Sequence, residues 1–381
     1  MGKHKSKHEA RNKQPDAAVQ QQPGQQEAGP SHVGQQDVHP ASGGEQPVDQ
    51  PAAAEPAAAH DASAPRVQAE SPKEPQQDQP LPRDEPIRPV KAEPVRLRGR
   101  MTLEDAFQSI AQNCVRQIEA NVPGVLEQNV ESLHQMRVGL RRLRALLDMF
   151  EELAAPPLAL HASIEWLSGE LGPARDWDVL ADSTLKRVQG IDAGALRQAA
   201  HERATAHHAQ ILYVLREERF AELMTQLNDW LGARRWRPED GLPKDSPLAE
   251  RAWKGAAPLL RKAEKRLAKR IDGLDENDAP GRHRVRIAAK KARYAAEFFR
   301  DLLPPRRVKR YLEHLEGLQD RLGLLNDLAV ADHLLEELKG GSSQVAKQAA
   351  YVRGYVAASG VAGAKGLSKT LADVAKRRIT R

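Results

Sequence analysis

The chain has 381 residues and a formal net charge of +6, and its single cysteine, Cys114, excludes an internal disulfide and a cysteine-based zinc site. No apolar stretch approaches the roughly 18 residues that a membrane-spanning helix needs. The basic start, MGKHKSKHEARNK, has no apolar segment after it and does not predict a secretory signal, so we expect a cytoplasmic protein.

Residues 1–100 predict a disordered tail that is rich in Gln, Pro and Ala. They hold 15 of the 26 prolines and no aromatic residue, with 13 basic and 14 acidic side chains. Without large apolar side chains, such a segment cannot bury enough surface to offset the entropy lost on ordering its backbone. Residues 101–381 are long enough for one large domain or for two coupled halves.

From residue 101 onward, apolar residues recur at three- and four-residue spacing, as they do on the buried face of a helix. Pro and Gly residues mark the expected helix ends. No run alternates β-branched or aromatic residues with polar ones, as a strand would. The pattern predicts an all-α protein with a break at 238–247. The expected helices cover residues 102–121, 126–153, 158–171, 175–188, 194–231, 247–272, 283–302, 306–322, 325–338, 343–358 and 366–378.

One pattern of basic residues occurs twice in the chain. The segments 134-HQMRVGLRRLR-144 and 283-HRVRIAAKKAR-293 both start with His and carry basic residues three, seven, eight and ten positions later. Further along, 171-LGPARD-176 matches 322-LGLLND-327, and the offset between copies stays close to 150 residues. A constant offset with matching chemistry indicates an internal duplication. We expect two related helical bundles that face each other about a pseudo-two-fold axis.

Each copy places its basic residues on one face of a helix and its apolar or small residues on the opposite face. An ordinary solvated face mixes acidic and basic residues, whereas these faces lack acids until Asp148 and Glu297. Arg holds phosphate through a two-bond fork, and ten helical residues spread the cations over about 15 Å. The pattern favours a long, densely charged anion. The candidate ligands to it are His134, Arg137, Arg141, Arg142 and Arg144 in the first copy, and His283, Arg286, Lys290, Lys291 and Arg293 in the second.

Several other residues are supporting candidates for the same site. Asp176, Asp178 and Asp327 carry negative charges that would balance the basic faces. The first copy has Arg175 where the second has Asn326, so we do not expect a symmetric role there. The two histidines either donate to the anion or form structural hydrogen bonds, and the sequence favours neither. The weaker basic candidates are Arg116 in the first expected helix and Arg261, Lys265 and Arg266 in the helix over 247–272.

The ordered set of these four motifs resembles the CHAD domain, the conserved histidine α-helical domain, from about Met101 to about Ala375. The resemblance implies two pseudo-symmetric, antiparallel helical bundles around a basic central pore, the first at about 101–240 and the second at about 247–381. It also implies that the residues named above bind inorganic polyphosphate, and that the protein associates with polyphosphate granules. The E-x-E-x-K signature of the triphosphate-hydrolysing domain that some members carry is absent.

We therefore expect a non-enzymatic polyphosphate-binding protein with no catalytic residue, cofactor or metal. Three alternatives stay open. An enzyme would use His134 or His283 as phosphoryl acceptor, or a metal ion on the aspartates. A scaffold would bind polyphosphate or polyhydroxyalkanoate granules and their surface proteins. A nucleic-acid-binding protein is disfavoured because the net charge is modest and few aromatic residues interrupt the basic segments, so we expect no specific nucleic-acid partner.

Overall fold

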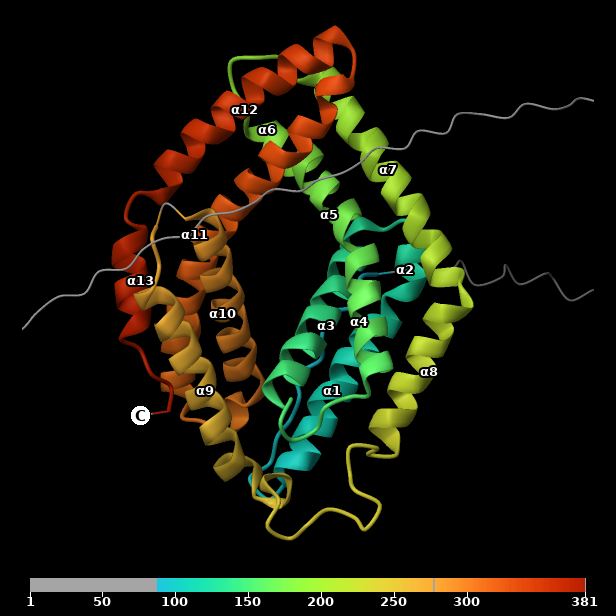
Figure 1. Cartoon of the computed structure of the whole chain (residues 1–381), viewed down its shortest axis with the longest axis vertical. Coiled ribbons are helices and arrows are strands. Elements are labelled where there is room, and N and C mark those ends of the chain that lie inside the picture. The colour runs from blue at the N-terminus through green and yellow to red at the C-terminus, as the bar shows by residue number, and fades with distance from the viewer. Residues whose placement is uncertain (1–87, 277, 381) are drawn as a thin grey trace, which may run out of the picture. The chain divides into compact units, whose positions relative to one another are not determined.

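The structure is a computed structural model that describes residues 88–276 and 278–380. The expected tail lies outside the described residues as far as residue 87. The described part is built from helices, with one isolated β-bridge between Thr102 and Arg251, and this confirms the all-α prediction. The α-helices (Figure 1) are α1 (Leu103–Ala120), α2 (Val122–Leu126), α3 (Val130–Met149), α4 (Leu158–Glu170), α5 (Gly172–Val179), α6 (Leu185–Arg187), α7 (Gly194–Arg216), α8 (Glu218–Gly232), α9 (Ala252–Asp272), α10 (Ala279–Phe298), α11 (Pro305–Glu337), α12 (Ser343–Ala364) and α13 (Leu367–Ala375).

Two predicted divisions between helices were wrong, and several helix ends differ from the prediction by four to six residues. The helix expected over 194–231 is divided into α7 and α8, because Glu217 adopts an extended backbone with φ −68° and ψ 146°. Conversely, the helices expected over 306–322 and 325–338 form the continuous α11, which passes through Gly323. A single glycine inside a helix costs only about 1 kcal/mol, and the buried Leu322 and Leu325 on either side outweigh that cost.

Residues 88–100 pack on the helices, whereas the sequence predicts a tail as far as residue 100. The backbone NH of Val90 donates to Oδ1 of Asn121 at 2.9 Å, and Nδ2 of Asn121 donates to the Val90 carbonyl at 2.8 Å. Leu97 is buried, and its NH donates to Oδ2 of Asp301 at 3.2 Å. This proline-rich extended segment has no apolar period, so its packing leaves no signal in the sequence.

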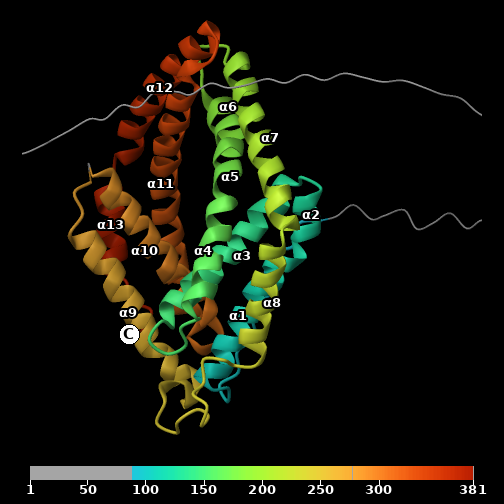
Figure 2. The same cartoon turned by 45° about the vertical axis from the view of Figure 1, so that its right-hand side comes forward.

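The packing of the helices repeats in the two copies. Helix α1 packs on α3 as α9 packs on α10, and α5 packs on α7 as α11 packs on α12. Helices α3 and α10, which carry the repeated basic segments, contact each other directly. Figure 2 shows α9 to α13, the helices of the second copy, on one side and α1, α3 and α8 of the first copy on the other. This is the arrangement that an internal duplication with a pseudo-two-fold axis predicts.

The apolar residues form two separate cores. The larger core spans both copies, and Phe150 at the end of α3 faces Phe299 at the end of α10 with ring centroids 6.5 Å apart. The smaller core joins α5 and α7 to the second half of α11 and to α12, around Trp177 and Leu335. The chain passes from the larger to the smaller core at Asp176 in α5 and at Asp327 in α11.

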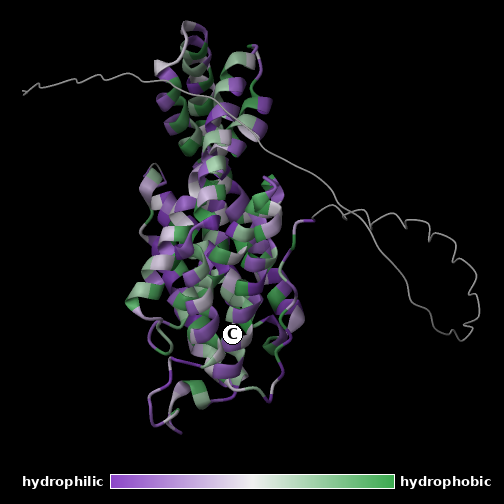
Figure 3. Cartoon of the chain, turned by 90° about the vertical axis from the view of Figure 1, so that its right-hand side faces the viewer, coloured by the Kyte–Doolittle hydropathy of each residue, from purple (hydrophilic) through white to green (hydrophobic). Residues whose placement is uncertain are grey.

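A membrane-spanning helix needs about 18 mostly apolar residues, and none of the described helices meets this requirement. In Figure 3, hydrophilic and hydrophobic residues alternate along the helices, as expected for helices that bury one face.

A buried carboxylate ties α1 to the segment that follows α8. The side chain of Glu104 is only 3% exposed. It accepts hydrogen bonds from Nε1 of Trp236 at 2.9 Å, from Arg234 at 2.6 Å and from Nε of Arg237 at 2.7 Å. Burial opposes ionisation of Glu104, but these hydrogen bonds and the charges of both arginines outweigh burial and lower its pKa.

We expect Glu104→Ala to destabilise the protein by about 3 kcal/mol, because removing one partner of a buried ion pair leaves the other charges uncompensated. Urea unfolding followed by circular dichroism measures the change. The matched control is Glu222→Ala on α8, where the side chain is exposed and the expected change is within about 0.5 kcal/mol. Equal stability of the two variants would show that the Glu104 cluster contributes nothing.

Candidate anion-binding site

Local sequence signals place the two basic helices. Helix α3 begins where the side chain of Asn129 accepts a hydrogen bond from the NH of Ser132 at 2.9 Å, which satisfies a free donor of the first turn. Gly139 lets α3 approach α1 closely, since a Cβ there would lie 3.0 Å from Cγ1 of Ile118. The second copy has the small residue Ala288 at the equivalent position, and it is buried.

A groove of about 690 Å³ lies between α3, α10 and the start of α4. Five basic residues from both copies line it: Arg141, Arg144, Arg286, Lys290 and Lys291. The other walls include Glu151 and Glu165 and a set of apolar residues. The groove therefore combines the two repeated segments in one site, although they are 149 residues apart in the chain.

Three cations that line this groove, Arg141, Arg286 and Lys290, form an inner cluster with Arg137, which lies outside the lining but close enough for its charge to act on Arg141 and Lys290. Burial, the charges of Arg286 and Arg141 and, more weakly, that of Arg137 lower the pKa of Lys290 to about 8. Burial, followed by the charges of Arg141 and Arg175, lowers the pKa of Arg137 to about 10 although Asp176 opposes this. The free protein therefore holds these charges at a cost in free energy.

The hydrogen-bonding capacity of this cluster is largely unused. The Nε atoms of Arg137, Arg141 and Arg286 are buried and have no hydrogen-bond partner among the described residues. Arg137 donates through one terminal nitrogen to the Leu171 carbonyl. Over residues 88–276 and 278–380, neither Arg141 nor Arg286 nor Lys290 has a carboxylate within ion-pair distance. Buried donors without partners are rare in folded proteins, and two of these three residues, Arg141 and Arg286, line a groove that an anion can enter.

Asp176 and Asp327 lie beyond the cations at the junction of the two cores. Both line a small cavity of about 60 Å³ together with Arg286. Burial and the charge of Asp327 raise the pKa of Asp176, while Arg137 and Arg286 oppose this. Among the residues that the structure describes, no three His, Cys, Asp or Glu side chains gather as metal ligands. The two aspartates therefore balance part of the positive charge.

The two histidines have different surroundings. His134 is half-buried, and burial together with the charge of Arg175 lowers its pKa. His283 is exposed, and its Nδ1 lies 3.1 Å from Oδ1 of Asn326. The residues Arg175 and Asn326, which align in the two copies, thus each lie beside the histidine of their own copy, but only Asn326 is hydrogen-bonded to it.

Three of the predicted basic ligands are engaged by other side chains. Arg142 turns toward α1, where it donates to Oε1 of Gln117 at 2.9 Å and to Oδ1 of Asn113 at 3.0 Å. Arg293 donates to Oε1 of Glu297 at 2.7 Å. Lys291 pairs with Asp148 on α3 at 2.8 Å. Arg142 and Arg293 do not line the groove, and the charge of Lys291 is partly neutralised.

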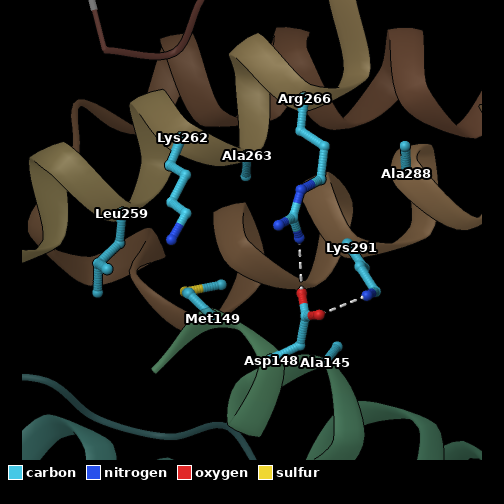
Figure 4. A pocket seen from close by; sticks show the side chains of 9 residues that line it. All are labelled: Ala145, Asp148, Met149, Leu259, Lys262, Ala263, Arg266, Ala288 and Lys291. Atoms are coloured by element: carbon cyan, nitrogen blue, oxygen red, sulfur yellow. Dashed lines mark hydrogen bonds and ion pairs between the residues drawn. The ribbon is translucent and has the colours of Figure 1, made fainter. Parts of the chain in front are cut away.

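Asp148 also pairs with Arg266 of α9, at 3.0 Å. Figure 4 shows this carboxylate between Arg266 and Lys291 where α3, α9 and α10 meet. Arg144 is partly exposed and lies 3.4 Å from Glu165. The ion pairs of Asp148 join the two copies, and the inner cluster remains as the concentrated positive charge.

The remaining supporting candidates lie elsewhere. Asp178 is buried, and its Oδ1 lies 3.1 Å from Nε2 of His208 on α7, so it holds α5 to α7. Arg116, Arg261 and Lys265 are exposed and do not line the groove. The sequence did not indicate His208 as the partner of Asp178, because the two residues share no periodic pattern.

The apolar part of the groove was not foreseen from the sequence either. Leu158 and Ile287 are exposed by 90% and 41%, and they line the groove together with Tyr294. The available signal was Leu158, an apolar residue directly after Pro156-Pro157 that fits no buried helical face.

Comparisons with known proteins agree with this architecture. A model of the CHAD domain family matches residues 109–336. The crystal structure of the CHAD domain from the plant Ricinus communis has 34% sequence identity and a TM-score of 0.70, and the match covers 77% of this chain and 98% of that chain. The structure of PptA from Streptomyces chartreusis has 17% identity and a TM-score of 0.55 over 72% of this chain and 99% of that chain, a likeness of fold alone. No curated protein sequence matches. The chain belongs to the CHAD domain family, as the motifs predicted.

Proposed function

We propose that the protein binds inorganic polyphosphate, without hydrolysing it, in the groove between α3 and α10. The observation that carries this proposal is the inner cluster of Arg137, Arg141, Arg286 and Lys290, in which three guanidinium Nε atoms lack partners. Guanidinium groups bind phosphate oxygens through charge-assisted hydrogen bonds, and a linear polyanion satisfies several of them at once. Membership of the CHAD family supports the same ligand.

A protein whose groove binds polyphosphate along its length would be retained at polyphosphate granules. The surroundings of Asp176 also support binding over catalysis. The charges of Arg137 and Arg286 act on this carboxylate, so it balances part of their positive charge. Polyphosphate granules are therefore the proposed location, and polyphosphate the proposed partner.

The test is calorimetric titration of the full chain with long-chain polyphosphate at several salt concentrations. Binding should weaken with salt, and the logarithm of the association constant should fall with a slope of about −3 against the logarithm of salt concentration, as expected for four paired cations on a flexible polyanion. Orthophosphate should bind far more weakly, since it can reach only part of the cluster. A slope near zero, or equal affinity for orthophosphate, would refute the proposal.

Two further measurements distinguish polyphosphate binding from an enzymatic function and from general binding of polyanions. Release of phosphate from polyphosphate during long incubation with the protein would indicate an enzyme. Displacement of polyphosphate by single-stranded or duplex nucleic acid of equal charge, at fixed salt, would indicate a general polyanion site. We expect intact polyphosphate chains and little displacement, because Tyr294 is the single Phe, Tyr or Trp among the described residues that line the groove, and successive bases need a row of such residues to stack on.

A further inference from the structure

A second concentration of positive charge lies outside the groove, in three stretches that are far apart in the sequence. Residues 96–100, 300–310 and 376–380 contain eleven basic residues and one acidic residue, Asp301. We call the eleven Arg and Lys residues of these stretches the basic patch. None of them lines the groove between α3 and α10.

Contacts between the stretches bring the basic patch together at the start of α11. The backbone NH of Leu97 donates to Oδ2 of Asp301 at 3.2 Å, which places residues 96–98 beside 300–302. The C-terminal stretch follows α13, and α13 packs on α11. Burial and the charge of Glu264 raise the pKa of Tyr311, and the charge of Arg378 opposes them, so Arg378 lies near the second turn of α11.

The charges of the basic patch are accessible and largely unpaired. Ten of its eleven residues are exposed, and Arg378 is half-buried. Among the residues that the structure describes, its one ion pair joins Lys309 to Glu313, at 4.0 Å. An ordinary solvated surface pairs basic with acidic side chains, so this excess of positive charge favours an external polyanion.

The carboxylates that contact these stretches are engaged by the backbone or by a hydroxyl group. Asp301 accepts the hydrogen bond from the NH of Leu97. Glu264 is buried, and it accepts hydrogen bonds from the NH of Ile379 and, at 2.7 Å, from the hydroxyl group of Thr380. Neither carboxylate forms an ion pair with a cation of the basic patch, so both leave the arginines free for a ligand.

The composition of the basic patch indicates the chemistry of its ligand. Nine of its eleven cations are arginines, whose planar guanidinium groups fit phosphate oxygens. The three stretches contain no aromatic residue on which a base could stack, and no exposed large apolar residue that could enter a lipid bilayer. These features favour a bare chain of phosphates.

We propose that the basic patch is a second polyphosphate-binding surface, through which one molecule joins the chain in its groove to another chain outside it. This inference rests on the proposed function, because the groove holds the first chain. A single exposed patch binds weakly, since water and salt screen its charges. A long second chain gains affinity by contacting the patches of several molecules that lie along the first chain. The protein thus cross-links polyphosphate in addition to coating it.

The test is a sandwich binding measurement with the full chain. Long-chain polyphosphate is fixed to a sensor surface and saturated with protein, and fluorescently labelled long-chain polyphosphate is added after free protein has been washed away. We expect the protein layer to capture the labelled chain, but not labelled triphosphate, which can reach only one patch. Higher salt should release the labelled chain before it releases the protein, because the patch is more exposed than the groove.

A variant of the basic patch should separate the two surfaces. It should bind the fixed polyphosphate within a few-fold of the natural protein, because its groove is intact, and capture of the labelled chain should fall at least about tenfold. The substituted side chains are exposed and have no described ion-pair partner, so the packing of the core is unchanged. The four changes are Arg96→Gln, Arg306→Gln, Arg310→Gln and Lys376→Gln.

The matched control removes three arginines and one lysine that are also exposed but lie on α6, α7 and α12, outside the basic patch. It should capture the labelled chain as the natural protein does. Equal losses in the two variants would show that net charge holds the second chain, and would overturn the inference. The control changes are Arg187→Gln, Arg203→Gln, Arg216→Gln and Lys347→Gln.

The remaining outcomes distinguish this inference from the proposed function. Failure of the natural protein to bind the fixed polyphosphate would overturn the proposed function itself. A natural protein that binds but captures no labelled chain, or a patch variant that captures it fully, overturns the second surface and leaves the groove assignment standing. Preferential capture of duplex DNA of equal charge, or of vesicles with equal amounts of phosphatidylcholine and phosphatidylserine, would overturn the assignment in favour of a nucleic acid or a membrane.

Discussion

Replacing Arg137, Arg141, Arg286 and Lys290 together with Gln is expected to weaken binding of long-chain polyphosphate by at least about 1,000-fold. Each charge-assisted hydrogen bond contributes about 1.5–3 kcal/mol, and each 1.4 kcal/mol is a factor of ten in affinity. Even about 1 kcal/mol per residue gives this loss. Gln is chosen because it retains much of the side-chain length, so the packing of α3 on α10 is preserved.

The same variant should be more stable than the natural protein when no anion is present. The four cations are crowded and partly desolvated, and the gain from ending their repulsion outweighs the loss of the charges that face Asp176, because the pKa of Asp176 is raised even with those charges present. We expect its melting temperature to rise by roughly 5 °C in calorimetry without polyphosphate. Polyphosphate should raise the melting temperature of the natural protein and leave that of the variant unchanged, since only a ligand that binds the folded state stabilises it.

The matched control removes the same number and type of charges outside the groove. Arg116, Arg261, Lys265 and Arg270 are exposed, and they do not line the groove. Their replacement with Gln should reduce affinity by only a few-fold, because exposed charges act on the anion through screened, long-range attraction. If both quadruple variants lost affinity equally, the protein would bind polyphosphate by net charge, and the α3–α10 groove would have no special role.

Polyphosphate binding is expected to weaken by about tenfold between pH 7 and pH 9, because the Lys290 ammonium deprotonates in that range in the free protein. Burial and the neighbouring charges of Arg286 and Arg141 lower its pKa to about 8. Above this pH, Lys290 must take up a proton before it can pair with phosphate, and one linked proton changes affinity up to tenfold per pH unit. Titrations across this range in buffers of different ionisation enthalpy measure both the affinity and the proton uptake.

Lys290→Arg isolates the effect of this residue. Arg stays charged, so the decline in affinity and the proton uptake above pH 8 should both largely disappear. The free energy of unfolding should change with pH in the opposite direction to the affinity. Between pH 8 and pH 10.5 the unfolded chain binds the Lys290 proton more strongly than the folded chain does. The contribution of Lys290 to the free energy of unfolding therefore rises with pH in that range. A natural protein and a Lys290→Arg variant with identical pH profiles would contradict the assignment.

The fold class and the family follow from the order of residues along the chain. Apolar periodicity located almost all the helices because a helix buries one face, a property that neighbouring residues encode. The repeated spacing of His134, Arg137 and Arg141 with His283, Arg286 and Lys290 identified the duplication and the two helices that form the groove. These features depend on residues close together in the chain.

Which of the repeated cations are available to a ligand depends on contacts between distant parts of the chain. Arg141 and Arg142 are adjacent and chemically identical, but 100° of helical rotation turns Arg141 into the groove and Arg142 toward Gln117 on α1. Lys291 is paired with Asp148, whereas its neighbour Lys290 has no described partner. The partners come from distant segments of the chain, and the apolar part of the groove likewise forms only where the start of α4 meets α10. Contacts of this kind follow from packing and have no period in the sequence.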